Sequence, residues 1–85
     1  MMDADAVWDV LMELAGATED WRADFVRHAG LNPTDLEYRF GGKLGFGGKA
    51  RTDGRRWWVD CYPEDETPER RAIVAAVNAR IGGGA

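Results

Sequence analysis

The chain has 85 residues, 45% of them hydrophobic and 31% charged, with four Trp, two Tyr and three Phe. This composition is that of a globular protein and excludes a disordered chain. The length supports one hydrophobic core, so we expect a single domain over residues 1–82 and a flexible tail at 83–85. No apolar run reaches the ~20 residues that span a bilayer, and the N-terminus is acidic where a signal peptide is basic. A cytoplasmic protein is therefore expected.

The chain has few groups for metal or redox chemistry. Cys61, its one cysteine, has no partner for an internal disulfide, and with His28 it leaves too few soft ligands for structural zinc. We expect no metal and no cofactor. Burial of apolar surface must then stabilise the fold.

Charge is unevenly distributed along the chain, whose net charge is −4. Residues 1–35 carry eight acids against two arginines, a net charge of −6. Residues 36–60 carry six cations against three acids, a net charge of +3. The predicted strands are therefore basic and the N-terminal helices acidic.

A first helix is predicted after Asp3 or Asp5, either of which can cap it, and Gly16 ends it. Its apolar positions follow helical spacing. They are Val7, Trp8, Val10, Leu11, Met12 and Leu14.

A second helix is predicted from a Thr18 cap to Gly30 as the residue that ends it. Its buried side is expected to hold Trp21, Phe25, Val26 and Ala29. The acidic residues of both helices fall opposite these apolar positions, as they do on a solvated surface. Their alternative role is to mimic the charge of nucleic acid toward another protein.

Three strands are predicted next, because apolar and polar residues alternate over 36–40, 44–50 and 55–62. The Asp53-Gly54 pair predicts a two-residue hairpin loop in which Thr52 pairs with Arg55. This register places Trp57, Val59 and Cys61 on the core face. In the first hairpin, a three-residue loop that pairs Phe40 with Leu44 brings Leu36, Tyr38, Phe40, Leu44 and Phe46 onto the same face.

A third helix is predicted after Thr67, which caps it, with Pro68 in its first turn and Gly82 at its end. Its apolar positions are Ile73, Val74, Val77 and Ile81. The fold class is therefore α+β: two helices, a three-stranded antiparallel meander and a C-terminal helix, in the order ααβββα.

The outward face of the meander is the candidate binding site. Glycines opposite bulky rings can simply make room for them, which is the structural interpretation. The functional interpretation is that rings flanked by cations bind a base, a nucleotide or a partner side chain. The residues concerned are Lys43, Lys49, Arg51, Arg56, Trp58 and Tyr62.

Two catalytic interpretations find little support in the sequence. Gly48-Lys49 is not a phosphate loop, because Lys43 stands where that motif has Gly and Ala50 where it has Ser or Thr. A dyad of Cys61 and His28 lacks a second base and a nucleophile elbow. We expect a protein that is not an enzyme.

The segments YRFGGKLGFGGK (38–49) and WWVDCYPEDETPER (57–70) resemble a scattered family of short proteins from actinobacterial phages and prophages. The resemblance covers about the C-terminal half of the chain. It implies no activity and no catalytic residues.

Three functions remain open from the sequence. The first is a non-enzymatic interaction protein, such as a phage accessory or anti-defence factor that binds a host protein in the host cytoplasm. The second is a binder of nucleotides or short nucleic acids, although an isoelectric point near 4.8 opposes it. The third is a structural or assembly protein that forms a homo-oligomer. No membrane partner is expected.

Overall fold

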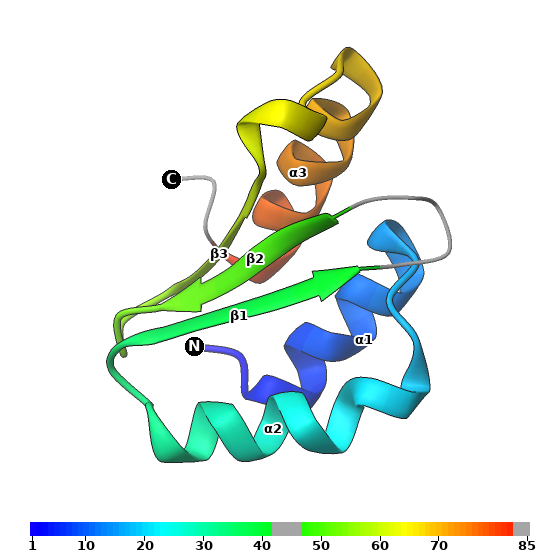
Figure 1. The fold of residues 1–85 in the computed structure, drawn as a ribbon. Coiled ribbons are helices and arrows are strands. Elements are labelled where there is room, and N and C mark those ends of the chain that lie inside the picture. The colour runs from blue at the N-terminus through cyan, green and yellow to red at the C-terminus, as the bar shows by residue number, and fades with distance from the viewer. Residues whose placement is uncertain (42–46, 83–85) are drawn as a thin grey trace.

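The computed structural model describes residues 1–41 and 47–82 (Figure 1). Its order of elements confirms the predicted α+β class and the arrangement ααβββα. The elements are α1 (Ala4–Ala15), the 3-10 turn η1 (Glu19–Trp21), α2 (Arg22–Leu31), β1 (Leu36–Gly41), β2 (Gly47–Thr52), β3 (Trp57–Cys61), the 3-10 turn η2 (Pro63–Asp65) and α3 (Pro68–Ile81). Lys43, Leu44 and Phe46 lie outside the described residues, as does the predicted tail at 83–85.

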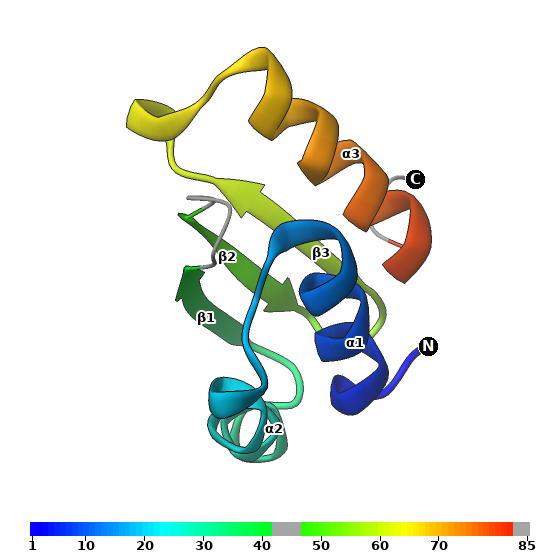
Figure 2. The same cartoon turned by 90° about the vertical axis from the view of Figure 1, so that its right-hand side faces the viewer.

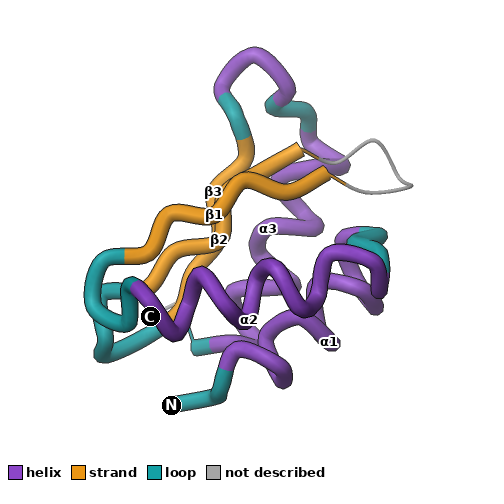
Figure 3. Tube along the Cα trace, turned by 60° about the horizontal axis from the view of Figure 1, so that its bottom comes forward, coloured by secondary structure: helices purple, strands orange, loops and turns teal. Residues whose placement is uncertain are grey.

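The three strands form an antiparallel sheet in the order β1-β2-β3, and the helices pack on one face of it (Figures 2 and 3). Trp8 of α1 is buried against the rings of Phe25 from α2 and of Tyr38 and Phe40 from β1. Val77 and Ile81 of α3 complete this core. None of the described helices is both long enough and apolar enough to cross a membrane.

Capping groups set the ends of α1 and α3 as predicted. Asp3 Oδ1 accepts a hydrogen bond from the Ala6 N–H at 2.8 Å, and Thr67 Oγ1 accepts one from the Arg70 N–H at 3.1 Å. Gly16 and Gly82 end the two helices in the left-handed conformation that glycine adopts without strain.

The second helix differs from the prediction at both ends. Thr18 precedes the turn η1 and its side chain makes no capping hydrogen bond, so α2 begins only at Arg22. At the other end the helix continues through Gly30 to Leu31, because the Asn32 backbone N–H and side chain both donate to the His28 carbonyl. Trp21, predicted to be buried, is 58% exposed, since the late start places it before the helix.

The predicted two-residue loop between β2 and β3 is wrong. Thr52 pairs with Trp57, which leaves a four-residue loop over 53–56. Side chains account for the longer loop: Asp53 Oδ1 accepts hydrogen bonds from the N–H groups of Arg55 and Arg56, and Thr52 Oγ1 accepts from the Gly54 N–H. Asp53 therefore caps the turn and keeps a negative φ, where the predicted loop requires a positive one.

The register of the first hairpin also differs from the prediction. Phe40 pairs with Gly48 and not with Leu44. Both hairpins are shifted by an even number of residues, so each side chain of the described strands keeps its predicted face. Leu36, Tyr38, Phe40, Ala50, Trp57 and Val59 are accordingly buried. Cys61, predicted in the core, is half-buried at its edge.

Helix α3 packs beside β3, and its residue Asn78 makes two hydrogen bonds with that strand. The Asn78 amide accepts a hydrogen bond from the Val59 N–H at 2.7 Å and donates one to the Val59 carbonyl at 3.1 Å. A neighbouring strand would supply the same pair of bonds. At Val59, Asn78 thus makes the hydrogen bonds that a fourth strand would make.

Substitution of the turn glycine should destabilise the fold. Gly54 has φ of +89°, and a Cβ built on it would lie 2.9 Å from Thr34 Cγ2. We expect Gly54→Ala to lower the free energy of unfolding by about 1–2 kcal/mol in urea titrations. Gly30→Ala is the matched control, because it adds the same methyl group in open space on a helix and should raise stability by about 0.5–1 kcal/mol. Equal stability of the two variants would contradict this account.

Replacing the Asn78 amide should lower the free energy of unfolding by more than a surface substitution does. Asn78→Leu keeps the side-chain size but leaves the Val59 N–H and C=O without partners, so we expect a loss of about 2–4 kcal/mol in the same titrations. Asn78→Asp retains an acceptor for the N–H and should lose less. If the leucine variant is as stable as the parent chain, the two hydrogen bonds do not hold α3 to the sheet.

Candidate functional site

The face of the sheet that points away from the helices carries most of the predicted site. We call this the outer face and define it by the alternate residues of the three strands together with Arg56 and Tyr62 at the two ends of β3. Its members are Glu37, Arg39, Lys49, Arg51, Arg56, Trp58, Asp60 and Tyr62.

Two aromatic rings of the outer face each lie against cationic side chains. The Arg56 guanidinium carbon is 5.0 Å from the ring centroid of Trp58. The Arg39 guanidinium carbon and Lys49 Nζ are 5.6 and 5.8 Å from the centroid of Tyr62. Such cation–π contacts hold both partners in place while the cations stay in water.

Gly47 lies next to the Tyr62 ring. A Cβ at this position would lie 3.7 Å from Tyr62 Cδ2, which is an ordinary van der Waals distance, so the ring does not require a glycine here. The distance gives no support to the interpretation that the glycines make room for bulky rings. The neighbours also differ from the prediction, which placed Gly47 opposite Asp60 and Tyr62 opposite Gly45. Gly45 lies outside the described residues.

Carboxylates partly neutralise the cations of this face. Arg51 bonds Glu37 at 2.8 Å and lies 3.8 Å from Asp60, and Lys49 Nζ is 3.6 Å from Glu37. The hydrogen bond from Arg51, assisted by the charge of Lys49, lowers the pKa of Glu37 below its ordinary value. Four cations face two carboxylates, so the outer face remains positive within an acidic protein.

Five of the six predicted binding residues lie together on the outer face: Lys49, Arg51, Arg56, Trp58 and Tyr62. The sixth, Lys43, lies outside the described residues. Their neighbours differ from the prediction, since Trp58 pairs with Arg51 and not with Lys49. The prediction missed Arg39, although its alternation with Tyr38 and Phe40 already placed it on the outward face.

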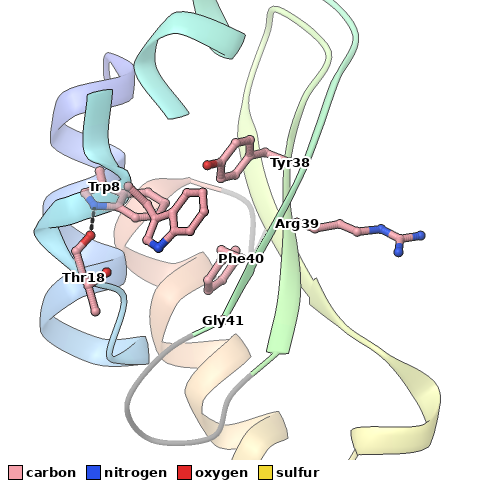
Figure 4. Close-up of a pocket in the computed structure, with 7 residues that line it drawn as sticks. Trp8, Thr18, Tyr38, Arg39, Phe40 and Gly41 are labelled. Atoms are coloured by element: carbon pink, nitrogen blue, oxygen red, sulfur yellow. Dashed lines mark hydrogen bonds between the residues drawn. The ribbon is translucent and has the colours of Figure 1, made fainter. Parts of the chain in front are cut away.

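A hollow lies at the end of β1, apart from most of the outer face. It has a volume of about 550 Å³ and is lined by Trp8, Thr18, Trp21, Tyr38, Arg39, Phe40 and Gly41. In Figure 4, Trp8, Tyr38 and Phe40 lie on the helix side of β1, and Arg39 points away to the other side. The Trp8 indole N–H donates to the Thr18 carbonyl at 3.0 Å, so the wall of the hollow is fixed. The hollow was not predicted from the sequence, because Trp21 was expected in the core.

A tyrosine, an aspartate and a histidine meet between β1 and α2. Tyr38 Oη donates to Asp24 Oδ2 at 2.6 Å, and His28 Nε2 lies 3.5 Å from Asp24 Oδ1. Arg27 also contacts Asp24, and the Tyr38 hydroxyl is the largest cause that lowers the pKa of this carboxyl. The cluster joins α2 to the sheet. His28 and Cys61 lie on different elements, and no hydrogen bond joins them.

The acidic N-terminal helices neutralise part of their own charge. Arg22 contacts Asp5, Asp9 and Glu19, which come from α1 and from the turn η1. Three of the eight acids in this region therefore share one arginine that holds the two helices together. This arrangement gives the carboxylates a structural role and weakens the nucleic-acid mimicry hypothesis.

Comparison of the chain with family models, with curated proteins and with solved structures found no match. Among residues 1–41 and 47–82, no group of three or more His, Cys, Asp or Glu side chains is placed to hold a metal ion. The functional interpretation therefore depends on the geometry of the outer face and of the hollow at the end of β1.

Stability should depend on pH through the Tyr38–Asp24 bond. Because folding lowers the pKa of Asp24, this contribution is complete above about pH 4 and is lost as the pH falls through the folded-state pKa. In Tyr38→Phe we expect the pKa of Asp24 to rise toward its ordinary value and the loss of stability in acid to become smaller. Carboxyl-carbon NMR titration and urea titrations at several pH values measure both effects.

Tyr62→Phe is the control for this prediction, because it removes a hydroxyl group from the opposite face of the sheet. It should leave the pKa of Asp24 unchanged. An Asp24 carboxyl that titrates alike in the parent chain and in Tyr38→Phe would show that the hydroxyl does not stabilise the carboxylate.

Proposed function

We propose that this chain is a non-enzymatic interaction protein whose outer face binds an acidic surface of another protein. The observation that carries the proposal is the composition of that face. Trp, Tyr and Arg are the residues that dominate protein–protein interfaces, and the outer face presents Trp58, Tyr62 and three arginines on a rigid sheet. Cation–π contacts already hold these side chains in the free protein, so binding costs little further side-chain entropy.

Charge supports a protein partner over a nucleic acid. Glu37 and Asp60 lie among the cations of the outer face, where a phosphate backbone would meet them as like charges. The cations also cover one side of the Trp58 and Tyr62 rings and compete there with a stacking base. A partner with carboxylates and apolar side chains can pair with the excess cations and pack on the rings.

The resemblance to short phage and prophage proteins makes a host protein the expected partner. A phage accessory or anti-defence factor acts by occupying a surface of a host protein. The size of the chain and the absence of catalytic motifs in its sequence agree with that role. Cytoplasmic action in the host follows from the same proposal.

Trp58 should contribute most to binding. Two fluorescent probes of equal negative charge separate the candidate functions: a peptide of alternating Glu and Leu, and a single-stranded oligodeoxynucleotide. We expect the peptide to bind the parent chain more tightly than the oligonucleotide does. Trp58→Ala should weaken peptide binding about 30-fold, as expected for an interface residue worth about 2 kcal/mol.

Trp21→Ala is the matched control, because it truncates an exposed indole away from the outer face and should leave peptide affinity unchanged. Preferential binding of the oligonucleotide that falls steeply with salt would favour the nucleic-acid function instead. Equal peptide affinity in the parent chain and in Trp58→Ala would refute the proposed role of the outer face.

A further inference from the structure

The backbone groups at the two edges of the sheet differ in their hydrogen-bond partners. At the β3 edge, Asn78 satisfies both backbone groups of Val59, and α3 lies beside the strand (Figure 2). At the β1 edge, no described residue outside the sheet makes a hydrogen bond with the backbone of Glu37 or Arg39. Open edge strands present these groups to any strand that can pair with them.

The Asn78 bonds also show which backbone N–H and C=O groups of β1 point away from the sheet. Because both backbone groups of Val59 point to Asn78, those of its partner Ala50 point to β1, where Tyr38 receives them. The backbone groups of Tyr38 therefore point inward. Alternation along the strand turns the N–H and C=O groups of Glu37 and Arg39 toward the open edge.

The charged residues of one β1 strand are complementary to those of a second, antiparallel β1 strand. If two β1 strands pair antiparallel about a two-fold axis at Tyr38, Glu37 of each copy faces Arg39 of the other, and these are hydrogen-bonded pairs. A shift of the axis to residue 37 would oppose two glutamates, and a shift to residue 39 would oppose two arginines. Charge therefore selects the register centred on Tyr38.

Exposed apolar residues at the two ends of α2 would meet across the same two-fold axis. Trp21 precedes α2 and lines the hollow beside Phe40 and Gly41, at the end of β1. Leu31 ends α2 near the start of β1, because the helix runs antiparallel to the strand (Figure 1). These two residues are 58% and 67% exposed. The axis exchanges the ends of β1 and so brings Leu31 of each copy toward the hollow of the other.

We propose that β1 is the interface of a two-fold dimer of this chain. The two β1 strands pair antiparallel about Tyr38 and join the two sheets into one sheet of six strands. Each copy contributes Glu37 and Arg39 to two cross-strand ion pairs, and the α2 helices lie side by side beneath them. The dimer does not depend on the proposed function, but it sets two outer faces side by side in one surface.

Analytical ultracentrifugation of charge variants tests the register. Glu37→Arg and Arg39→Glu each place like charges opposite one another in both pairs, so we expect each to raise the dimer dissociation constant at least tenfold. In an equimolar mixture every cross-strand pair becomes attractive, and dimers should reappear that hold one chain of each kind. Native mass spectrometry identifies these mixed dimers by mass.

Three controls separate the dimer from effects on the fold and from the proposed function. Glu13→Arg makes the same charge change at the α1–α3 contact, where Glu13 bonds Arg80 at 3.1 Å, and should dimerise like the parent chain. Arg39→Pro removes the outward N–H and should abolish the dimer, whereas Arg39→Ala, which keeps that N–H, should only weaken it. Trp58→Ala should leave the dimer intact even if it abolishes peptide binding. Circular dichroism checks that each variant is folded.

Three outcomes would overturn the inference. The first is a mass of one chain at about 1 mM protein, a concentration that populates even a dimer held by about −4 kcal/mol. The second is a dimer that survives Arg39→Pro, because such a dimer would use another surface. The third is a mixture of the two folded charge variants that stays monomeric, because the Glu37–Arg39 register predicts that it dimerises.

Discussion

The pair of hydrogen bonds between Asn78 and Val59 makes the two edges of the sheet different. A three-stranded sheet has two edges and two faces, and a chain of 85 residues has few elements with which to cover them. Asn78 satisfies both outward backbone groups of Val59 at the β3 edge, and this contact shows which backbone groups of the paired strands point inward. At the opposite edge, the outward backbone groups belong to Glu37 and Arg39. One edge of the sheet is therefore covered by a helix side chain at Val59, while the described residues leave the backbone of Glu37 and Arg39 open to a further strand.

The outer face follows from placing all three helices on the other side of the sheet. An uncovered face must keep its large rings in place without a second apolar layer, and here cationic side chains do so by lying against Trp58 and Tyr62. Glu37 lies 3.6 Å from one of these cations, Lys49, and with Asp60 it also contacts Arg51 beside them. The same contacts that order the face also give it the residues of an interface, so stability and binding draw on one set of side chains.

Local signals predicted the elements of this fold, and longer-range contacts decided their details. Asp3, Thr67 and Gly82 act within their own helices, so the sequence indicated those ends correctly. The hairpin register depends on the Asp53 and Thr52 side chains, which satisfy the turn in a way that the Asp-Gly pattern does not reveal. The exposure of Trp21 depends on where α2 begins. The predicted outward residues came together because alternation survives any even shift of register, whereas the hollow needed the packing of β1 against the α1–α2 connection.

The four tryptophans divide into two spectroscopic classes. Trp8 and Trp57 are 1% and 3% exposed, and each donates its indole N–H to a backbone carbonyl, that of Thr18 and that of Met2 respectively. Trp21 and Trp58 reach the solvent, one at the β1 hollow and the other on the outer face. A water-soluble quencher would reach the emission of the second pair first. The chain thus carries intrinsic fluorophores at both of its candidate interaction surfaces, against a background of two that report on the core.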